Sequence, residues 1–140
     1  MKVYIASKYI THQVLNRQIF NELSNAGIAA FLPETINIDA ISDDEMLAVA
    51  EICYSEIEKC DVILVVCPFG QSVACELGYA IAIRKLHQKK VSIVALNSDI
   101  QNEAMIYPYI DKTVGDISQL IKYLKSISDE SKYCSDIESY

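Results

Sequence analysis

The chain has 140 residues, of which 51% are hydrophobic and 22% charged, and 19 acidic against 12 basic side chains give it a formal net charge of −7. A globular chain of this length buries enough surface to fold around a single core, which excludes collagen-like, disordered and disulfide-stapled classes of protein. The acidic balance, without a basic run longer than Lys89-Lys90, argues against nucleic acid or an anionic membrane as a partner.

Strand-sized apolar runs alternate along the chain with segments of helical periodicity. The expected strands are residues 3–6, 28–32, 62–66, 91–96 and 112–114. The expected helices are residues 11–26, 43–59, 73–87 and 116–127. Thr11, Ser72 and Asp116 can cap the helices expected over 11–26, 73–87 and 116–127. Ser42 and Glu45 predict a capping box at the start of the helix expected over 43–59.

The connecting segments and the C-terminal end are expected to be irregular. Residues 34–41 show neither a clear period nor turn chemistry and predict a loop, while 99–109 predict a loop or a short helix. The last residues, 128–140, are polar and predict an irregular tail. No repeat or linker divides residues 1–127, so we expect them to form one domain.

The alternation predicts an α/β fold, a doubly wound parallel sheet of five strands in the flavodoxin-like order 2-1-3-4-5, within a single domain. In such a sheet the strand order reverses between the first and third strands, and ligands bind outside the carboxyl ends of these two strands. Residues 6–10 and 67–76 follow the two strands, so we expect them to line the ligand crevice.

The cysteines indicate a reducing environment. Their number is odd, and no two have the close spacing of a zinc site or of a redox Cys-x-x-Cys motif. They are Cys53, Cys60, Cys67, Cys75 and Cys134. We therefore expect small, buried thiols in a cytoplasmic protein, a view that agrees with the lack of a signal peptide pattern and of a membrane-length apolar run.

Glu76 lies at the mouth of the expected crevice, one turn into the helix predicted over 73–87. The positive end of the helix dipole favours its ionised form. A charged carboxylate suits attack on the anomeric carbon of a sugar, because an oxocarbenium-like transition state is stabilised by a nearby anion and collapses onto it. On position alone, an equally good interpretation is that Glu76 only stabilises the start of the helix.

Three blocks of the sequence occur in the order of the predicted elements. They read Val-Tyr-Ile-Ala-Ser at 3–7, Cys-Asp-Val-Ile-Leu-Val-Val at 60–66 and Ser-Val-Ala-Cys-Glu-Leu-Gly-Tyr-Ala-Ile-Ala at 72–82. The combination of an apolar strand after an Asp, a short loop and a helix with Glu-x-Gly-x-Ala resembles the nucleoside 2-deoxyribosyltransferase family. The resemblance covers about residues 1–127.

The resemblance implies a covalent mechanism. A deoxyribosyl group would form an intermediate on Glu76 and pass to another nucleobase or, as in nucleotide-hydrolase relatives, to water. Tyr4 would lie close to this carboxylate and position it, although a core aromatic with its hydroxyl at the rim is an equally good interpretation. Asn102 and Met105 resemble the segment that family members contribute to a neighbouring subunit's site, which implies a homodimer or a higher homo-oligomer. No metal or cofactor is required.

Three positions depart from the family pattern. Cys53 stands eight residues before Asp61, where an acidic residue often holds the sugar or the base. Gly70 replaces a common Asp or Ser of the loop before the nucleophile, and Ser72 replaces the usual loop glycine. Other carboxylates could supply the missing acid: Glu51, Glu56 and Asp61. Glu56 is equally well interpreted as part of a solvated helix face, and Asp61 as a cap at the entry of a strand.

The nature of the substrate depends on whether a phosphate group can bind. Relatives that accept nucleoside monophosphates hold the phosphate with small hydroxyl residues and Arg, and this chain offers Ser7, Lys8, Ser72 and Arg17. Glu103 stands near the position that a partner subunit would contribute, where its negative charge would repel a phosphate. Nucleosides are therefore favoured over nucleotides as the small-molecule partner.

The first hypothesis is an enzyme of nucleotide salvage that cleaves a (deoxy)nucleoside through Glu76 and transfers the deoxyribosyl group to another base. A nucleoside or nucleotide hydrolase that transfers the sugar to water is the close alternative. A catalytically silent, nucleotide-sensing module is the second hypothesis, because the acidic set is incomplete. The third is an NAD-cleaving enzyme of the TIR type, against which the Glu-Leu-Gly-Tyr-Ala block argues.

Overall fold

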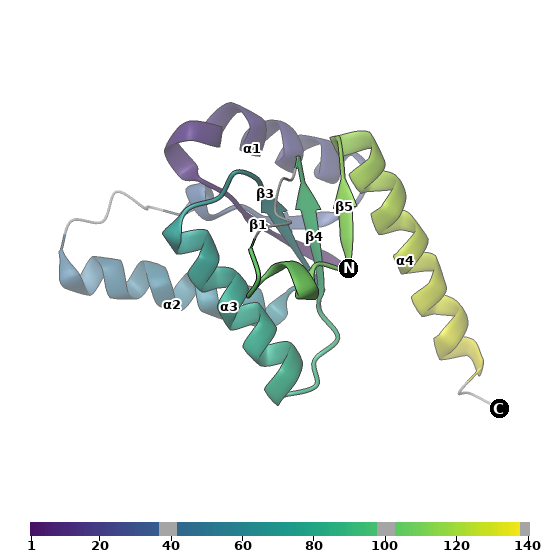
Figure 1. Ribbon diagram of the computed structural model, residues 1–140. Helices are drawn as coiled ribbons and strands as arrows, with labels where there is room; N and C mark the ends of the chain where they lie inside the picture. Colours follow the sequence, from purple (N-terminus) through teal and green to yellow (C-terminus); the bar gives the residue numbers. More distant parts are fainter. Residues whose placement is uncertain (37–41, 98–102, 138–140) are drawn as a thin grey trace.

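The computed structural model describes residues 1–36, 42–97 and 103–137 (Figure 1). The strands are β1 (Lys2–Ala6), β2 (Ala29–Phe31), β3 (Val62–Val66), β4 (Ser92–Leu96) and β5 (Lys112–Val114). The helices are α1 (Tyr9–Asn25), α2 (Asp43–Lys59), α3 (Gln71–Leu86) and α4 (Ile117–Ile137). The short 3₁₀ helix Pro33–Thr35 overlaps the start of the loop expected over 34–41. A second one, Tyr107–Tyr109, lies within residues 99–109, which were expected to form a loop or a short helix.

All strands are parallel and their order is β2-β1-β3-β4-β5, which confirms the predicted topology. The central strand β3 is a run of β-branched and leucine residues that is buried along its whole length. Such a run is typical of a parallel strand covered on both faces. In register, Tyr4 of β1 lies between Phe31 of β2 and Ile63 of β3, in the middle of the sheet.

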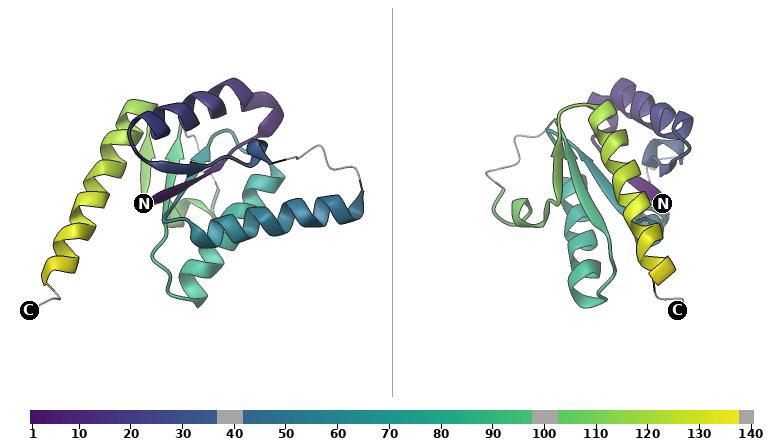
Figure 2. Two further views of the ribbon diagram at one scale, coloured as in Figure 1. Left: turned by 180° about the vertical axis from the view of Figure 1, so that it is seen from behind. Right: turned by 90° about the vertical axis from the view of Figure 1, so that its right-hand side faces the viewer.

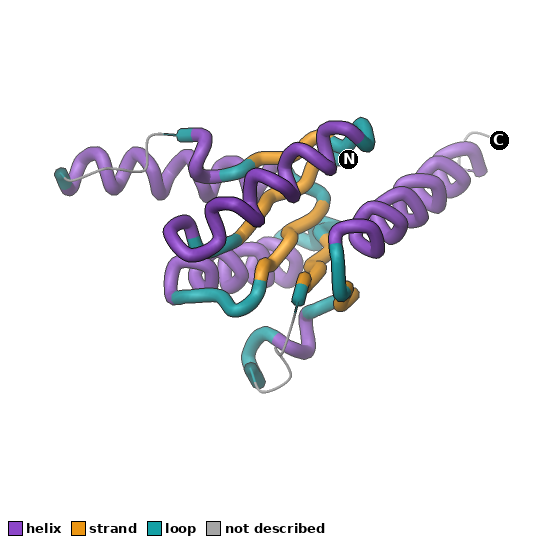
Figure 3. Tube along the Cα trace, turned by 90° about the horizontal axis from the view of Figure 1, so that it is seen from above, coloured by secondary structure: helices purple, strands orange, loops and turns teal. Residues whose placement is uncertain are grey.

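Two pairs of helices cover the two faces of the sheet (Figures 2 and 3). Because side chains alternate along a strand, Tyr4 and Ile63 face α2 and α3, whereas Val3 and Leu64 face α1 and α4. Figure 3 looks onto α1, with the strands behind it and α3 beyond them. The alternation therefore places the side chain of Tyr4 in the core between the sheet and the pair α2 and α3.

The start of α2 agrees with the sequence prediction in every detail. The Ser42 hydroxyl accepts a hydrogen bond from the Glu45 amide at 3.2 Å, and the Glu45 carboxylate accepts one from the Ser42 amide at 3.0 Å. The reciprocal bonds satisfy two backbone donors that a helix start leaves unpaired. At the start of α4, Asp116 caps as expected, because its Oδ1 accepts from the Gln119 amide at 2.8 Å.

The expected caps of α1 and α3 are wrong. Both helices begin earlier, at N-cap residues Lys8 and Gly70, which have extended backbones and make no side-chain capping bond. Thr11 and Ser72 lie inside the first turns. Only two residues separate β1 from α1, so the helix has already begun when the chain reaches Thr11.

The C-terminal tail is also corrected, because α4 continues through the predicted boundary at 127 to Ile137. No glycine or proline interrupts residues 117–137, and Leu120 and Leu124 are fully buried against the sheet. A polar composition alone does not end a helix that packs along one face. Figure 2 shows α4 running past the sheet toward the C-terminus. Within the described ranges, no helix has the length and apolar character needed to cross a membrane.

Candidate active site

A pocket of about 840 Å³ opens at the carboxyl ends of β1 and β3, where the sequence predicted a ligand crevice. Its wall comes from three parts of the chain: residues 7–11 at the start of α1, one face of α2, and residues 70–73 with Cys75 and Glu76 at the start of α3. Pro33, after β2, completes the lining. The predicted crevice position is confirmed, and both predicted segments contribute to it.

Of the α2 wall of the pocket, sequence reasoning singled out only Cys53. Its residues share one helix face at spacings of three and four: Met46, Val49, Ala50, Cys53 and Tyr54. Most of them are apolar, so this side of the pocket suits the flat, weakly polar surface of an aromatic ligand. The periodic spacing was visible in the sequence, but it also fits a helix that packs on a core, and it carries no sign of a ligand.

The central polar contact of the pocket joins Tyr4 to Glu76. The Tyr4 hydroxyl donates to Oε1 of Glu76 at 2.7 Å. Tyr4 is fully buried in β1, while Glu76 lies in the second turn of α3 and reaches the pocket lining. The expected closeness of the two side chains is confirmed, and their catalytic roles stay predictions.

Burial decides the charge of Glu76. Desolvation raises the pKa of its carboxyl from the ordinary 4.5 to about 7, and the hydrogen bond from Tyr4 opposes that rise. The helix dipole favours the ionised form, as expected, but an effect of about 0.3 to 1 kcal/mol does not offset this desolvation. At neutral pH both forms are populated, so Glu76 can attack when ionised and exchange a proton otherwise.

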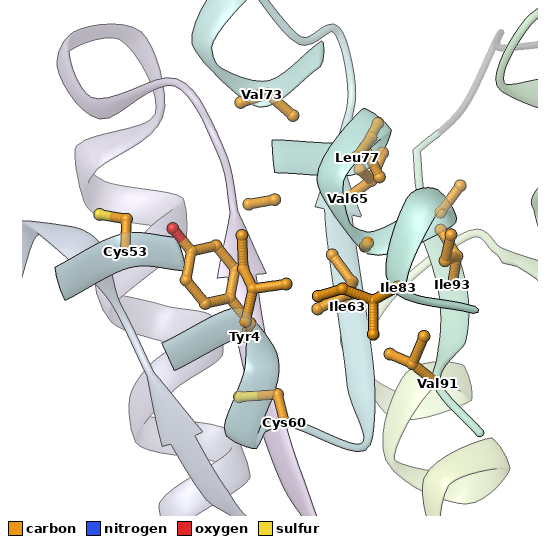
Figure 4. Packing of buried hydrophobic residues seen from close by; sticks show 14 of the residues in the cluster. Tyr4, Cys53, Cys60, Ile63, Val65, Val73, Leu77, Ile83, Val91 and Ile93 are labelled. Carbon is orange, nitrogen blue, oxygen red and sulfur yellow. The ribbon is translucent and has the colours of Figure 1, made fainter. Parts of the chain in front are cut away.

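Cys53 is the α2 residue nearest the Tyr4 hydroxyl in Figure 4, which shows that hydroxyl pointing from β1 toward the α2 helix. Burial raises the pKa of Cys53, so the thiol is neutral at physiological pH. Burial also raises the pKa of Tyr4 far above its ordinary value, assisted by the nearby Glu76 carboxylate. Tyr4 therefore keeps its proton and remains a donor.

A second, more polar region lies where α1 and α3 begin. Lys8 packs over Gly70, and a Cβ added to Gly70 would stand 3.3 Å from Cε of Lys8. The Ser7 hydroxyl lies 3.1 Å from Nδ1 of His12, a residue that sequence reasoning did not single out. Burial and the charge of Lys8 lower the pKa of His12. Ser72 adds a further hydroxyl to this region.

The structure does not bring the alternative carboxylates to the pocket. Asp61 precedes β3 and so lies at the opposite edge of the sheet from Glu76, where it accepts a hydrogen bond from the Lys2 amide at 2.7 Å. The prediction that Asp61 is catalytic is not supported by this position, and its interpretation as a strand-entry cap fits. Glu56 is paired with Lys2 and Lys59, and Glu51 is exposed outside the lining.

The residues expected near a partner subunit do not line this pocket. Met105 is 85% exposed, and Glu103 is exposed as well. Asn102 lies outside the described residues. Arg17, considered as a phosphate ligand, pairs instead with Glu34 at 2.9 Å. Among the residues whose side chains the structure describes, no cluster of His, Cys, Asp or Glu is suited to a metal ion.

Comparison with known proteins establishes the fold. No model of a protein family matches the chain, and no curated protein matches it. The structure resembles a 2-deoxyribosyltransferase from the psychrotolerant bacterium Bacillus psychrosaccharolyticus with a TM-score of 0.69 and 17% identity, over 86% of this chain and 90% of that one. It also resembles a conserved protein from Enterococcus faecalis V583 (TM-score 0.63, 18% identity, 90% and 98% covered).

A further similar structure is a CMP N-glycosidase from Clostridium botulinum, with a TM-score of 0.56 and 13% identity over 91% of this chain and 99% of that one. Because the matched structures share so little sequence with the chain, their likeness shows a common fold. At the level of the fold, the resemblance indicated by the three sequence blocks is confirmed.

Proposed function

We propose that this chain is a member of the nucleoside 2-deoxyribosyltransferase family that cleaves the N-glycosidic bond of a (deoxy)nucleoside through Glu76 and transfers the deoxyribosyl group to another base. The observation that carries the proposal is the contact of 2.7 Å between the Tyr4 hydroxyl and Glu76 in the wall of the pocket. The names of two structural neighbours, a 2-deoxyribosyltransferase and a CMP N-glycosidase, support the same chemistry.

In the first step, an oxygen of ionised Glu76 forms a bond to C1′ of the sugar. The bond from C1′ to the base nitrogen breaks, and its electron pair leaves with the base. Tyr4 holds Oε1, which leaves Oε2 as the oxygen for the attack. In the second step, a nitrogen of another base attacks C1′ and the carboxylate leaves. If water attacks C1′ in place of that base, the product is the free sugar. Transfer and hydrolysis would use the same residues of this protein.

The apolar face of α2 and the polar start of α1 and α3 divide the pocket into two regions. The α2 face, which includes Val49 and Tyr54, suits the base, and Glu76 lies beside this wall. Among the described lining residues, Glu76 alone carries a carboxyl group. A leaving base consequently has no second carboxylic acid beside it in this lining, so we expect slower turnover than in relatives that have one.

A second candidate substrate, a nucleoside monophosphate, is favoured by the polar region at Lys8. Lys8, Ser7 and Ser72 bring a positive charge and two hydroxyl groups to the same side of the pocket. These groups suit a phosphate attached to the sugar. The chemistry at Glu76 would be unchanged.

The experiment incubates the purified protein with a deoxynucleoside, with and without a second base, and with the corresponding monophosphate. Base exchange supports transfer, and free sugar supports hydrolysis. Glu76→Ala should abolish both, and mass spectrometry after a rapid quench should find a deoxyribosyl group on the peptide that contains Glu76. Glu22→Gln is a control, because Glu22 is exposed on α1. Full turnover by the Glu76→Ala variant would exclude Glu76 as the nucleophile.

We also propose that the protein is a homo-oligomer with contacts through residues 103–109. Met105 is 85% exposed and Tyr107 is 45% exposed. Large apolar side chains exposed together on a short segment are more common at interfaces than on a free surface. Gel filtration at micromolar concentration should give an apparent mass above that of one chain, and a strict monomer would contradict the proposal.

A further inference from the structure

The aromatic side chain of Tyr54 joins the pocket to the contact between α2 and α3. Tyr54 is the last residue of α2 in the pocket lining. Its ring packs against the ring of Tyr79 on α3, with 4.6 Å between the ring centroids and an angle of 50° between the ring planes. Tyr79 itself does not line the pocket, so it can act on a bound molecule only through Tyr54.

A carboxylate holds the other end of Tyr79. The Tyr79 hydroxyl donates a hydrogen bond to Oε1 of Glu58. Tyr54 and Glu58 are four residues apart on α2 and lie on one face of that helix, so the side chain of Tyr79 contacts both. The hydrogen bond to Glu58 raises the pKa of Tyr79, which therefore keeps its proton and remains the donor.

The surroundings of this contact are fixed as well. Lys89, which follows α3, donates to the backbone oxygen of Glu58. Helices α2 and α3 cover the same face of the sheet, and Tyr54 and Tyr79 both pack against the core on that face (Figure 1). The ring of Tyr54 thus has neighbours outside the pocket that restrict its rotation.

An aromatic ring that is ordered before binding is a good contact for a nucleobase. Every base has a π-face that can pack on such a ring, and little conformational entropy is lost when the ring is already in place. We propose that Tyr54 is the residue of the α2 wall that contacts the base, and that Tyr79 and Glu58 are positioning residues that hold its ring. The inference rests on the proposed function, because it takes a nucleoside as the ligand.

The experiment measures the dissociation constants of the free bases adenine and cytosine by equilibrium dialysis. Tyr54→Ala should raise these constants about tenfold or more, because the contact between base and ring is lost. Tyr79→Leu leaves Tyr54 in the lining but removes the ring that supports it. The base constants of this variant should rise about two- to tenfold, because binding must then order one more side chain.

Smaller changes test the hydrogen bond of Tyr79. Tyr79→Phe keeps the ring and loses the bond to Glu58, and Glu58→Ala loses the same bond from the other side. Each should raise the base constants about twofold. Glu58→Gln keeps an acceptor and should stay near the wild type. Tyr123→Phe is the matched control, because Tyr123 packs on the opposite face of the sheet.

Double variants distinguish positioning from packing. If Tyr79 acts through Tyr54, Tyr79→Leu should have no further effect on base binding in a protein that carries Tyr54→Ala. A packing role alone would lower the unfolding midpoint of Tyr79→Leu without changing its base constants. Wild-type base constants for Tyr79→Leu, or the same rise with and without Tyr54→Ala, would overturn the proposal. If these variants do not fold, Tyr54→Leu and Tyr79→Phe replace them.

The binding measurement needs no turnover, so the two proposals can fail separately. Bases that bind through Tyr54 and Tyr79 to a protein that cleaves no nucleoside would overturn only the proposed function. Cleavage through Glu76 by a protein whose base binding does not depend on Tyr79 would overturn only this inference. Binding of neither base by the wild type would overturn this inference as well.

Discussion

Replacement of Glu76 by glutamine should stabilise the protein at neutral and alkaline pH. The carboxyl of Glu76 is desolvated beside the buried Tyr4, and desolvation raises its pKa from the ordinary 4.5 to about 7. In the unfolded chain the same group titrates near its ordinary value. Above neutral pH, folding must therefore bury a charge that water stabilises better, and glutamine has no such charge.

The sign and the size follow from linkage. The folded pKa is raised, so the folded protein holds the proton more tightly than the unfolded chain. The contribution of Glu76 to stability is complete below about pH 4.5 and is lost as the pH rises to about 7. A pKa difference of this size corresponds to about 3 kcal/mol at most, because each pH unit is worth about 1.4 kcal/mol. We expect the variant to gain up to about that amount relative to the wild type across this window.

The measurement is the free energy of unfolding in urea from about pH 5 to about pH 9, for the wild type and Glu76→Gln. The difference between the two proteins should increase up to about pH 7 and then stay constant. Glu22→Gln, at an exposed site on α1, is the matched control. A difference for Glu76→Gln that is flat within about 0.5 kcal/mol, or that falls with pH, would refute the reasoning that burial dominates at this carboxyl.

Three further outcomes are expected. Tyr4→Phe removes the donor at 2.7 Å from Glu76, so the acidic limb of the pH–rate profile should move up by about 1 to 2 pH units, and a profile that does not move would contradict the role of Tyr4. Lys8→Met should raise KM for a nucleoside monophosphate about tenfold or more while changing KM for the nucleoside little. Equal changes in the two KM values would exclude Lys8 as a phosphate ligand. Ser42→Ala should lower the free energy of unfolding by about 1 kcal/mol, measured in urea, because the capping box is lost.

Much of the fold could be predicted because its causes are local. The buried run Val62–Val66 predicted a central parallel strand, and the pair Ser42 and Glu45 predicted the first residue of α2. A continuous apolar run and a hydrogen-bonding pair three residues apart can both be recognised from neighbours in sequence. The alternation of such elements, with right-handed crossovers, leaves few topologies, and the observed strand order is the expected one. The end of α4 was missed because a polar sequence without glycine or proline contains no signal for where the helix ends.

The sequence by itself also determined the edge of the sheet where the pocket opens and the presence there of Glu76, because these follow from strand order and from the position of one residue along a helix. Only the tertiary structure decided the chemical state of that carboxyl. Its proton affinity depends on desolvation in the folded protein and on a hydroxyl 72 residues away in the chain, and neither leaves a mark in the local pattern. The folded sheet likewise separated Asp61 from Glu76, because the two ends of a parallel strand lie at opposite edges.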